Sequence, residues 1–397
     1  MILNYKKLRM ISYGKQFIDS KDVLAVKKVL KGQWLTQGPL VKKFELALKN
    51  YFGSKYCAAV SNGTAALHLA GLALGWKKGD IVLTSPISFL ASSNCILYAG
   101  ATPDFVDINQ TNYNINLIKL EERIKKLKSL SKKVVAVVAT DFAGQPCDWK
   151  NLKRIALKYN IKLINDNCHA IGAKYCKDKS YAVKYADIVT HSYHPVKNIT
   201  TGEGGSILTN DKEIYNKINI LRSHGTQKNP KKMISNDGPW YYEMHELGYN
   251  YRITDIQSAL GISQLKKINK FIKKRKEIAK IYNKHFSQDN FYKIPKVEKS
   301  NSHAYHLYPL QINFKSNEQK KKLFKKLYDS KIKLQVHYIP IHLQPYYKKR
   351  YGFKKGDFPV AEDFYKREIS LPIYYSLDVK SIYKVIKIIK SFFKKKL

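Results

Sequence analysis

The sequence predicts an α/β protein: a large domain with a mostly parallel sheet flanked by helices, and a smaller C-terminal α+β domain. Short apolar runs of strand character alternate with helical patterns through the first two thirds of the chain. This repeated order favours a parallel sheet with helices on both faces. With 397 residues and 44% hydrophobic content, the chain can bury a large core and a satellite core. We expect the large domain and an N-terminal arm over residues 1–255, and a connector helix and the small domain over residues 256–397.

The first expected elements are two helices. Asp19 has the residue type of an N-cap and Gly32 that of a helix end, and the apolar face between them comprises Val23, Val26, Val29 and Leu30. A loop over residues 33–38 follows. Pro39 then opens a second helix, which runs to Gly53.

The strands of the large sheet follow in order. We expect them at residues 56–60, 80–84, 102–108, 134–140, 161–166, 186–191 and 207–209. Helices are expected at residues 61–75, from 86 onward, around 117–127 and at 212–221. Ligands of such sheets lie at the carboxyl ends of the strands. Ser61, Phe89, Gly144 and Asp166 fall at these ends, so the site is predicted there.

The C-terminal third has a different pattern. A long helical pattern from Thr254 to about Phe286 connects it to the large domain. Strands are then expected at residues 305–312, 333–338 and 368–371, separated by basic helices. This order predicts an α+β unit beside the large domain.

Lys197 is the candidate nucleophile. It lies in a loop between two expected strands, after Asp166 at the end of an earlier strand and before the glycine-rich run 202–205. A lysine becomes nucleophilic at neutral pH when desolvation lowers its pKa. A solvated surface charge is the alternative, because the chain has 72 Lys and Arg residues. Asp166 as a partner for a ring nitrogen and Ser192 as a phosphate ligand favour the functional reading.

The ordered string Ser-Tyr-His-Pro-Val-Lys-Asn-Ile-Thr-Thr-Gly-Glu-Gly-Gly, residues 192–205, resembles the active-site segment of nucleotide-sugar aminotransferases. These enzymes have the aspartate aminotransferase fold (fold type I) and use pyridoxal 5′-phosphate (PLP). The similarity covers nearly the whole chain and is greatest to the 4-aminotransferases of pseudaminic acid biosynthesis. It implies ping-pong transfer of an amino group from L-glutamate to C4 of a UDP-linked 4-keto-6-deoxy-N-acetylhexosamine.

The resemblance also implies residue roles. Lys197 would bind PLP as a Schiff base and then act as the acid and base. The other cofactor contacts would be Gly63, Thr64, Phe89, Asp166, His169, Ser192 and, from the neighbouring subunit of a homodimer, Asn250. Substrate contacts would be Tyr13, Gln33, Trp34, Leu35, Thr36, His337, Tyr338, Ile339 and Pro340.

Each of these residues also has an ordinary structural interpretation. Gly63 and Thr64 could form only a helix cap, and Phe89 could belong to the core. Trp34 could be a packed loop aromatic, and His169 and His337 could be a core histidine and a strand residue. Asn165 and Asn167 flank Asp166 where relatives often carry an acidic or a small residue, so the tuning of the ring partner could differ.

Composition narrows the alternatives. The net charge of +42 raises the possibility of nucleic-acid binding, but only eight of the 72 basic residues are arginines, and the lysines are spread along helix faces. We therefore expect no nucleic-acid partner. Five scattered cysteines without a Cys-x-x-Cys pair suit a reducing cytoplasm, and no metal-binding spacing or membrane segment is found.

Several functions remain open at this level. The protein could aminate another nucleotide-linked 3- or 4-keto sugar. A sugar dehydratase of the same fold is disfavoured, because those relatives replace the Schiff-base lysine with histidine. A basic nucleic-acid-binding protein and a scaffold without cofactor belong to other classes.

Overall fold

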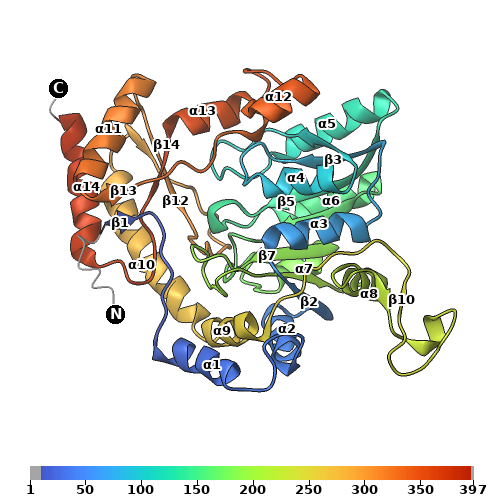
Figure 1. Cartoon of the computed structure of the whole chain (residues 1–397). Coiled ribbons are helices and arrows are strands. Elements are labelled where there is room, and N and C mark those ends of the chain that lie inside the picture. The colour runs from blue at the N-terminus through green and yellow to red at the C-terminus, as the bar shows by residue number, and fades with distance from the viewer. Residues whose placement is uncertain (1–9, 395–397) are drawn as a thin grey trace.

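A computed structural model of the protein describes residues 10–394 and shows a central sheet with helices packed on both faces (Figure 1). The part of the predicted arm before residue 10 lies outside the described residues. The sheet contains β2 (Tyr56–Val60), β3 (Asp80–Thr84), β4 (Thr102–Phe105), β5 (Lys133–Thr140), β6 (Lys162–Asp166), β7 (Ile188–Ser192) and β8 (Gly205–Thr209). Their order is β2-β8-β7-β6-β5-β3-β4. All pairs are parallel except those of β8, which runs antiparallel to both neighbours, so the mostly parallel sheet is confirmed.

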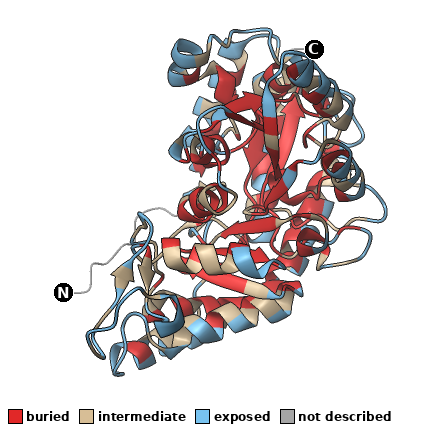
Figure 2. Ribbon diagram, turned by 90° about the vertical axis from the view of Figure 1, so that its right-hand side faces the viewer, coloured by how far each residue is buried: buried red, intermediate tan, exposed pale blue. Residues whose placement is uncertain are grey.

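Both faces of this sheet are apolar, and side chains alternate between them. In β2, Cys57 and Ala59 join one core cluster, whereas Ala58 and Val60 join the other. The first cluster packs under α2 (Pro39–Phe52), α5 (Leu117–Ser129), α6 (Trp149–Tyr159) and α7 (Tyr181–Tyr185), and the second under α3 (Gly63–Ala73), α4 (Ala91–Tyr98) and α8 (Lys212–Leu221). Figure 2 shows the buried residues concentrated in the strands and on the inner faces of the helices.

Helix α1 (Ser20–Leu30) begins as predicted, because the Asp19 side chain accepts hydrogen bonds from the first-turn amides. Its predicted apolar face is wrong in part. Val29 is buried, but Val23 and Leu30 are 58% and 59% exposed. The helix packs on its neighbour through a polar contact instead, since buried Asp22 accepts from Lys267 at 2.6 Å.

Two further helix predictions need correction. The pattern from residue 254 to 286 forms two helices, α9 (Asp255–Leu265) and α10 (Ile268–Phe286), and Lys267 at the break turns inward to Asp19 and Asp22. The segment from Pro86 to Phe89 is not helical, and α4 starts only at Ala91. The Ser85 hydroxyl accepts from the Ile87 amide, and the Ser88 hydroxyl bonds to those of Ser92 and Thr140, so side chains compete with helical hydrogen bonds here.

The C-terminal domain is built on a separate antiparallel sheet of β11 (Tyr292–Lys293), β12 (Tyr308–Ile312) and β14 (Glu368–Leu371). Helices α10, α11 (Asn317–Asp329) and α14 (Val379–Lys394) enclose a third core cluster with it. Helices α12 (Pro345–Tyr351) and α13 (Pro359–Arg367) lie between this domain and the large sheet (Figure 1).

The predicted strand at residues 333–338 is mostly irregular. Only β13 (Ile332–Lys333) is a strand, and it pairs with β1 (Ile11–Ser12) near the N-terminus. From residue 334 to 338 the backbone is irregular and meets β14 through one bridge, Gln335 to Ser370. Side chains of β14 take over part of the bonding, as when the His337 amide donates to the Glu368 carboxyl.

A short hairpin of β9 (Thr226–Gln227) and β10 (Glu243–Met244) projects from the body beyond α8 (Figure 1). Short 3-10 turns occur at Phe142–Gly144, Pro230–Lys232 and Ile341–Leu343. Over residues 10–394, no helix combines the length and apolar character needed to cross a membrane.

Candidate active site

A cavity of about 810 Å³ opens at the carboxyl ends of the sheet strands, between the large sheet and the irregular segment 335–338. Loops that follow parallel strands meet at this edge, so residues distant in sequence converge here. Ten of the predicted site residues line the cavity: Tyr13, Gly63, Thr64, Phe89, Asp166, His169, Ser192, Lys197, His337 and Tyr338.

Lys197 lies in the loop between β7 and β8. Its backbone amide donates to the His194 carbonyl at 2.9 Å, which fixes the turn that carries it. Burial lowers the pKa of the Lys197 amine below its usual range, and the neighbouring Cys168 thiol and Asp166 carboxylate oppose that shift. The amine is therefore more often neutral, and more nucleophilic, than a surface lysine.

Asp166 is the last residue of β6 and is buried. One carboxylate oxygen accepts from the Ser92 hydroxyl at 2.5 Å, and the other from the Cys168 amide at 3.2 Å. These two bonds orient the carboxylate within the cavity wall. It can hold a proton on a ring nitrogen that lies against it.

A second carboxylate lies buried behind this wall. Asp141 accepts hydrogen bonds from five groups, which are the Cys147 amide and the side chains of Trp149, Asn165, Asn167 and Tyr181. Two of these donors, Asn165 and Asn167, flank Asp166. The amide side chains that flank Asp166 thus anchor the end of β6.

An anion cradle forms at the N-terminus of α3. Asn62 caps the helix by accepting from the Ala65 amide at 2.8 Å, whereas the first-turn amides of Gly63 and Thr64 have no partner within the helix. Ser192 lies against Gly63 so closely that a Cβ there would come within 2.7 Å of the Ser192 Cβ. Only glycine leaves room for an anion between this turn and the Ser192 hydroxyl.

His169 is held in one tautomer. Its Nδ1 accepts from the Ala143 amide at 3.3 Å, so Nε2 carries the proton and donates to the Tyr338 hydroxyl at 3.1 Å. Burial first, then Lys197 and His337, keep the pKa of His169 well below its usual value, so the ring is neutral. Its ring lies 4.4 Å from that of His306. Phe89, 55% exposed, faces Tyr338 across the cavity with ring centroids 6.2 Å apart.

The other predicted site residues lie outside this cavity within the chain. Gln33 and Trp34 line a separate hollow beside α1 and α9, and the Leu35 carbonyl and Thr36 contact the start of α9. Asn250 pairs with Ser223, and Ile339 and Pro340 lead away from the cavity toward the 3-10 turn at residue 341. Only ten of the predicted site residues therefore line the cavity of the same chain.

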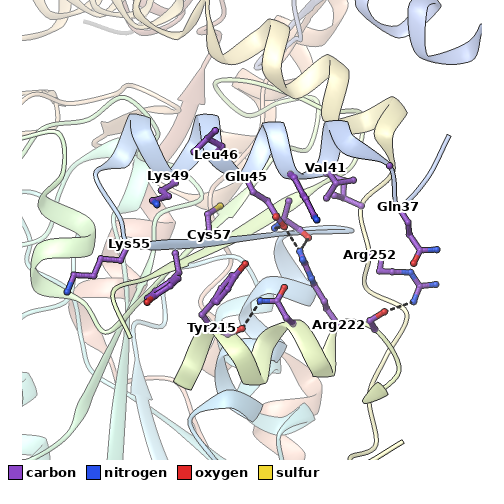
Figure 3. A pocket seen from close by; sticks show the side chains of 17 residues that line it. Gln37, Val41, Glu45, Leu46, Lys49, Lys55, Cys57, Tyr215, Arg222 and Arg252 are labelled. Carbon is purple, nitrogen blue, oxygen red and sulfur yellow. Dashed lines mark hydrogen bonds and ion pairs between the residues drawn. The ribbon is translucent and has the colours of Figure 1, made fainter. Parts of the chain in front are cut away.

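A different hollow, of about 690 Å³, opens between α2, β2 and α8 (Figure 3). Cations surround it, and one of them, Arg222, pairs with Glu45 at 2.6 Å. No predicted site residue lines it. It also lacks the convergence of a lysine with a lowered pKa, a buried carboxylate and an anion cradle that marks the first cavity.

Ser92 and His306 are among the contributions to the site that were not predicted. Ser92 reaches Asp166 from α4, and His306 enters the cavity wall from the segment before β12. Neither carries a distinctive local pattern, since a serine in a helix and a histidine near a strand are ordinary. The expectation that ligands lie at the carboxyl ends of strands finds the site residues in the loops there. It does not find these contacts from neighbouring elements.

Known proteins share this architecture. Residues 16–390 match the model of the DegT/DnrJ/EryC1/StrS aminotransferase family. The chain is 40% identical over 94% of its length, and 94% of the other, to the UDP-4-amino-4,6-dideoxy-N-acetyl-beta-L-altrosamine transaminase of Campylobacter jejuni. It is 32% identical to the GDP-perosamine synthase of Escherichia coli O157:H7, covering 96% of this chain and 97% of that one.

Solved structures agree. The PseC aminotransferase of Helicobacter pylori, which acts in pseudaminic acid biosynthesis, superposes with a TM-score of 0.87 at 31% identity, covering 97% of this chain and 100% of that one. The PLP form of Spr1654 from Streptococcus pneumoniae gives a TM-score of 0.89 at 27% identity, covering 98% and 100%.

Proposed function

The chain belongs to the DegT/DnrJ/EryC1/StrS aminotransferase family, and we propose that it moves an amino group from L-glutamate to C4 of a UDP-linked 4-keto-6-deoxy-N-acetylhexosamine. It is a PLP-dependent sugar aminotransferase. The observation that carries the proposal is the convergence of Lys197, Asp166 and the Gly63 cradle in one cavity. The 40% identity to the Campylobacter transaminase supports the particular sugar.

The residues present fit PLP. Gly63 leaves open the space that a phosphate would fill, and the Asp166 carboxylate faces the same cavity. In the proposed arrangement Gly63, Thr64 and Ser192 hold the phosphate and Asp166 pairs with the ring nitrogen. Phe89 covers the face of the ring, and His169 lies beside its hydroxyl. Bound there, PLP supplies an aldehyde that accepts the amino group and a ring that withdraws electrons from the reacting carbon.

Lys197 is the proposed proton carrier. Once its amine is free, it can take a proton from the carbon bearing the amino group and return one at the cofactor carbon. Burial lowers its pKa, so a larger share of the amine is the neutral base than in a surface lysine. His169 and Tyr338 form a bonded pair across the cavity, and this pair restricts where the substrate can lie.

Two parts of the proposal reach beyond one chain. We place Asn250 in the cofactor site of a partner subunit, so that the working unit is a homodimer with shared sites. The loop 33–36, with Tyr13, His337, Tyr338, Ile339 and Pro340, is proposed to bind the nucleotide sugar. Asn250 and loop 33–36 do not line the cavity of the same chain, which supports a contribution in trans.

A second candidate is the amination of another nucleotide-linked 3- or 4-keto sugar. The similarity to the GDP-perosamine synthase favours it, since that enzyme is named for a GDP-linked sugar.

The test uses purified protein with PLP, glutamate and a panel of UDP- and GDP-linked keto sugars. We expect a mass change corresponding to amination of the UDP-linked 4-keto-6-deoxy-N-acetylhexosamine. Amination of a GDP-linked or 3-keto sugar alone would replace the first candidate with the second. No amination of any sugar would contradict both.

A further inference from the structure

Strand β14 presents a polar face toward the cavity wall. Glu368 and Ser370 are two residues apart, so their side chains lie on the same face of the strand. Ile369 and Leu371 point the opposite way into the C-terminal core. All four are buried. A glutamate with no exposure must have a specific set of hydrogen-bond partners.

Those partners form a chain that ends at the cavity. The His337 amide donates to Glu368 Oε2 at 2.9 Å, and the Ser370 hydroxyl bonds to Glu368 Oε1 at 2.5 Å. His337 Nδ1 lies 2.8 Å from the same Ser370 hydroxyl. The order is therefore Glu368, Ser370, His337, and His337 lines the cavity.

The serine hydroxyl has a single proton, which links the states of its two neighbours. When Glu368 is a carboxylate, Ser370 donates to it and must accept from His337, so Nδ1 carries the imidazole proton. When Glu368 is protonated, it can donate to Ser370, which then donates to Nδ1. The imidazole proton must then be on Nε2, because burial, followed by Lys197, lowers the pKa of His337 to about 3 and keeps the ring neutral.

The nitrogen at the other side of the ring is available to a ligand. His337 Nε2 makes no hydrogen bond within residues 10–394 and is not shut off from solvent. Tyr13 packs beside the same ring, with centroids 5.0 Å apart. Nε2 can therefore meet a hydroxyl or an amide of a molecule in the cavity.

We propose that Glu368, acting through Ser370, determines which nitrogen of His337 carries the proton, and hence whether the cavity wall offers the nucleotide sugar an acceptor or a donor. Glu368 and Ser370 are positioning residues, and only His337 touches the substrate. The inference about recognition rests on the proposed function. The tautomer of His337 does not, because it is a property of the protein alone.

The charges around Glu368 set the pH at which the tautomer changes. Burial raises the pKa of Glu368 to about 8, while the Ser370 hydroxyl, the Lys320 ammonium and the His337 amide oppose that shift. Lys320 comes from α11, and burial lowers its own pKa to about 8, so its charge changes over the same pH range. Tyr113 from the large domain and Tyr338 also face this carboxyl, and neither is ionised below pH 9 because both phenol pKa values are raised. Lys197 is the cation that acts on His337 itself.

The direct test is nitrogen-15 NMR of the His337 imidazole at pH 6.5 and pH 9.5, with the resonance identified by its loss in His337→Asn. In the wild type we expect the proton on Nε2 at the lower pH and on Nδ1 at the higher pH. In Glu368→Gln the carbonyl oxygen is needed to accept from the His337 amide, so the NH₂ group faces Ser370 and should keep the proton on Nε2 at both pH values. Ser370→Ala should break the link, so that the tautomer no longer follows Glu368.

Kinetics test the consequence for recognition. Between pH 6.5 and 9.5 the wild-type kcat/KM for the nucleotide sugar should change about three- to tenfold more than that of Glu368→Gln or Ser370→Ala, the value of one hydrogen bond. The kcat/KM for glutamate should change equally in all three. Glu362→Gln is the matched control, because Glu362 also pairs with a buried histidine, His342 at 3.1 Å, away from the cavity.

Two results would overturn the inference. One is a His337 tautomer that stays the same in wild type and both variants at both pH values. The other is a tautomer that follows Glu368 while the kinetic pH profiles remain identical. If the wild type aminates no 4-keto sugar, the proposed sugar fails, but the NMR result still decides the tautomer. Melting curves of each variant distinguish a lost fold from a lost link.

Discussion

The two walls of the cavity are built in different ways. On the large-domain side, Asp166 lies at a strand end, Lys197 in a loop between two strands and Gly63 at a helix N-terminus. All three positions lie at or just after the carboxyl ends of strands of one sheet. On the C-terminal side, His337 and Tyr338 lie in an irregular segment that side chains of β14 hold. Regular backbone thus positions the first wall, and side-chain hydrogen bonds position the second. We expect the first to carry the chemistry and the second to adjust recognition.

The sharpest test of that division is Lys197→Ala. Loss of the proton carrier should lower the amination rate by at least about 10³-fold, since a positioned acid and base contributes on the order of 10²–10⁴-fold and the attachment of the cofactor is lost as well. The rate is followed by product mass. Lys42→Ala, in the cationic hollow between α2, β2 and α8, is the control and should behave as wild type. An amination rate of Lys197→Ala within tenfold of the wild-type rate would show that the first wall does not carry the chemistry.

Gly63→Ala tests the cradle of the same wall. The added Cβ would come within 2.7 Å of the Ser192 Cβ, so the turn or Ser192 must move. A misplacement of about 1 Å can lower a catalytic rate about 100-fold. By analogy, we expect the PLP affinity to fall by about 10- to 100-fold. Cofactor titration by absorbance measures it. Gly32→Ala, after α1 and outside the cavity, should leave the affinity unchanged. Unchanged affinity in Gly63→Ala would place the phosphate elsewhere.

Asp141→Asn tests whether the first wall depends on the buried hydrogen-bond network around Asp141. An amide would place an NH₂ group against two or three of the five donors that now meet the carboxylate. We expect a loss of about 2–4 kcal/mol in the free energy of unfolding, because buried donors would lose their acceptor. Denaturant unfolding measures it, with exposed Glu122→Gln as a control that should change little. A neutral result would mean that the network can rearrange.

Tyr338→Phe gives the smallest expected effect and probes the second wall. It removes the hydroxyl that accepts from His169 at 3.1 Å and leaves the ring in place. We expect kcat/KM to fall about three- to tenfold with little change in the chemistry step. Tyr347→Phe loses a similar bond, to Asn94 at 2.6 Å outside the cavity, and should keep full activity. A loss as large as that of Lys197→Ala would erase the contrast between the walls.

The same contrast explains what the sequence could predict. Asp166, Lys197 and Gly63 were predictable because strand and helix patterns are local and place polar residues at a common sheet edge. The segment 334–338 was wrongly predicted as a strand, since its apolar and aromatic residues fit that pattern while its bonding partners, Glu368 and Ser370, lie more than thirty residues later. Ser92 was missed for the same reason, because its contact with Asp166 joins separate elements.

The exposed face of α1 shows a similar limit. An apolar pattern at helical spacing predicts a buried stripe, but Val23 is exposed while Asp22 is buried. A buried carboxylate needs a partner, and Lys267 from the break between α9 and α10 supplies one at 2.6 Å. Such a pairing is visible only once the chain is folded.

Strand β8 runs antiparallel between β2 and β7, so the segment carrying Lys197 leaves the sheet at Ser192 and re-enters it alongside, at Gly205. The loop that carries the reactive amine is therefore anchored at both ends to neighbouring strands. New chain termini engineered within residues 193–204 would cut this loop. Lys197 would then lose its fixed position, whereas the sheet would stay intact. Termini moved to the projecting hairpin at residues 228–242 would leave the loop uncut. Circular permutants could thus separate the folding of this enzyme from the precision of its reactive centre.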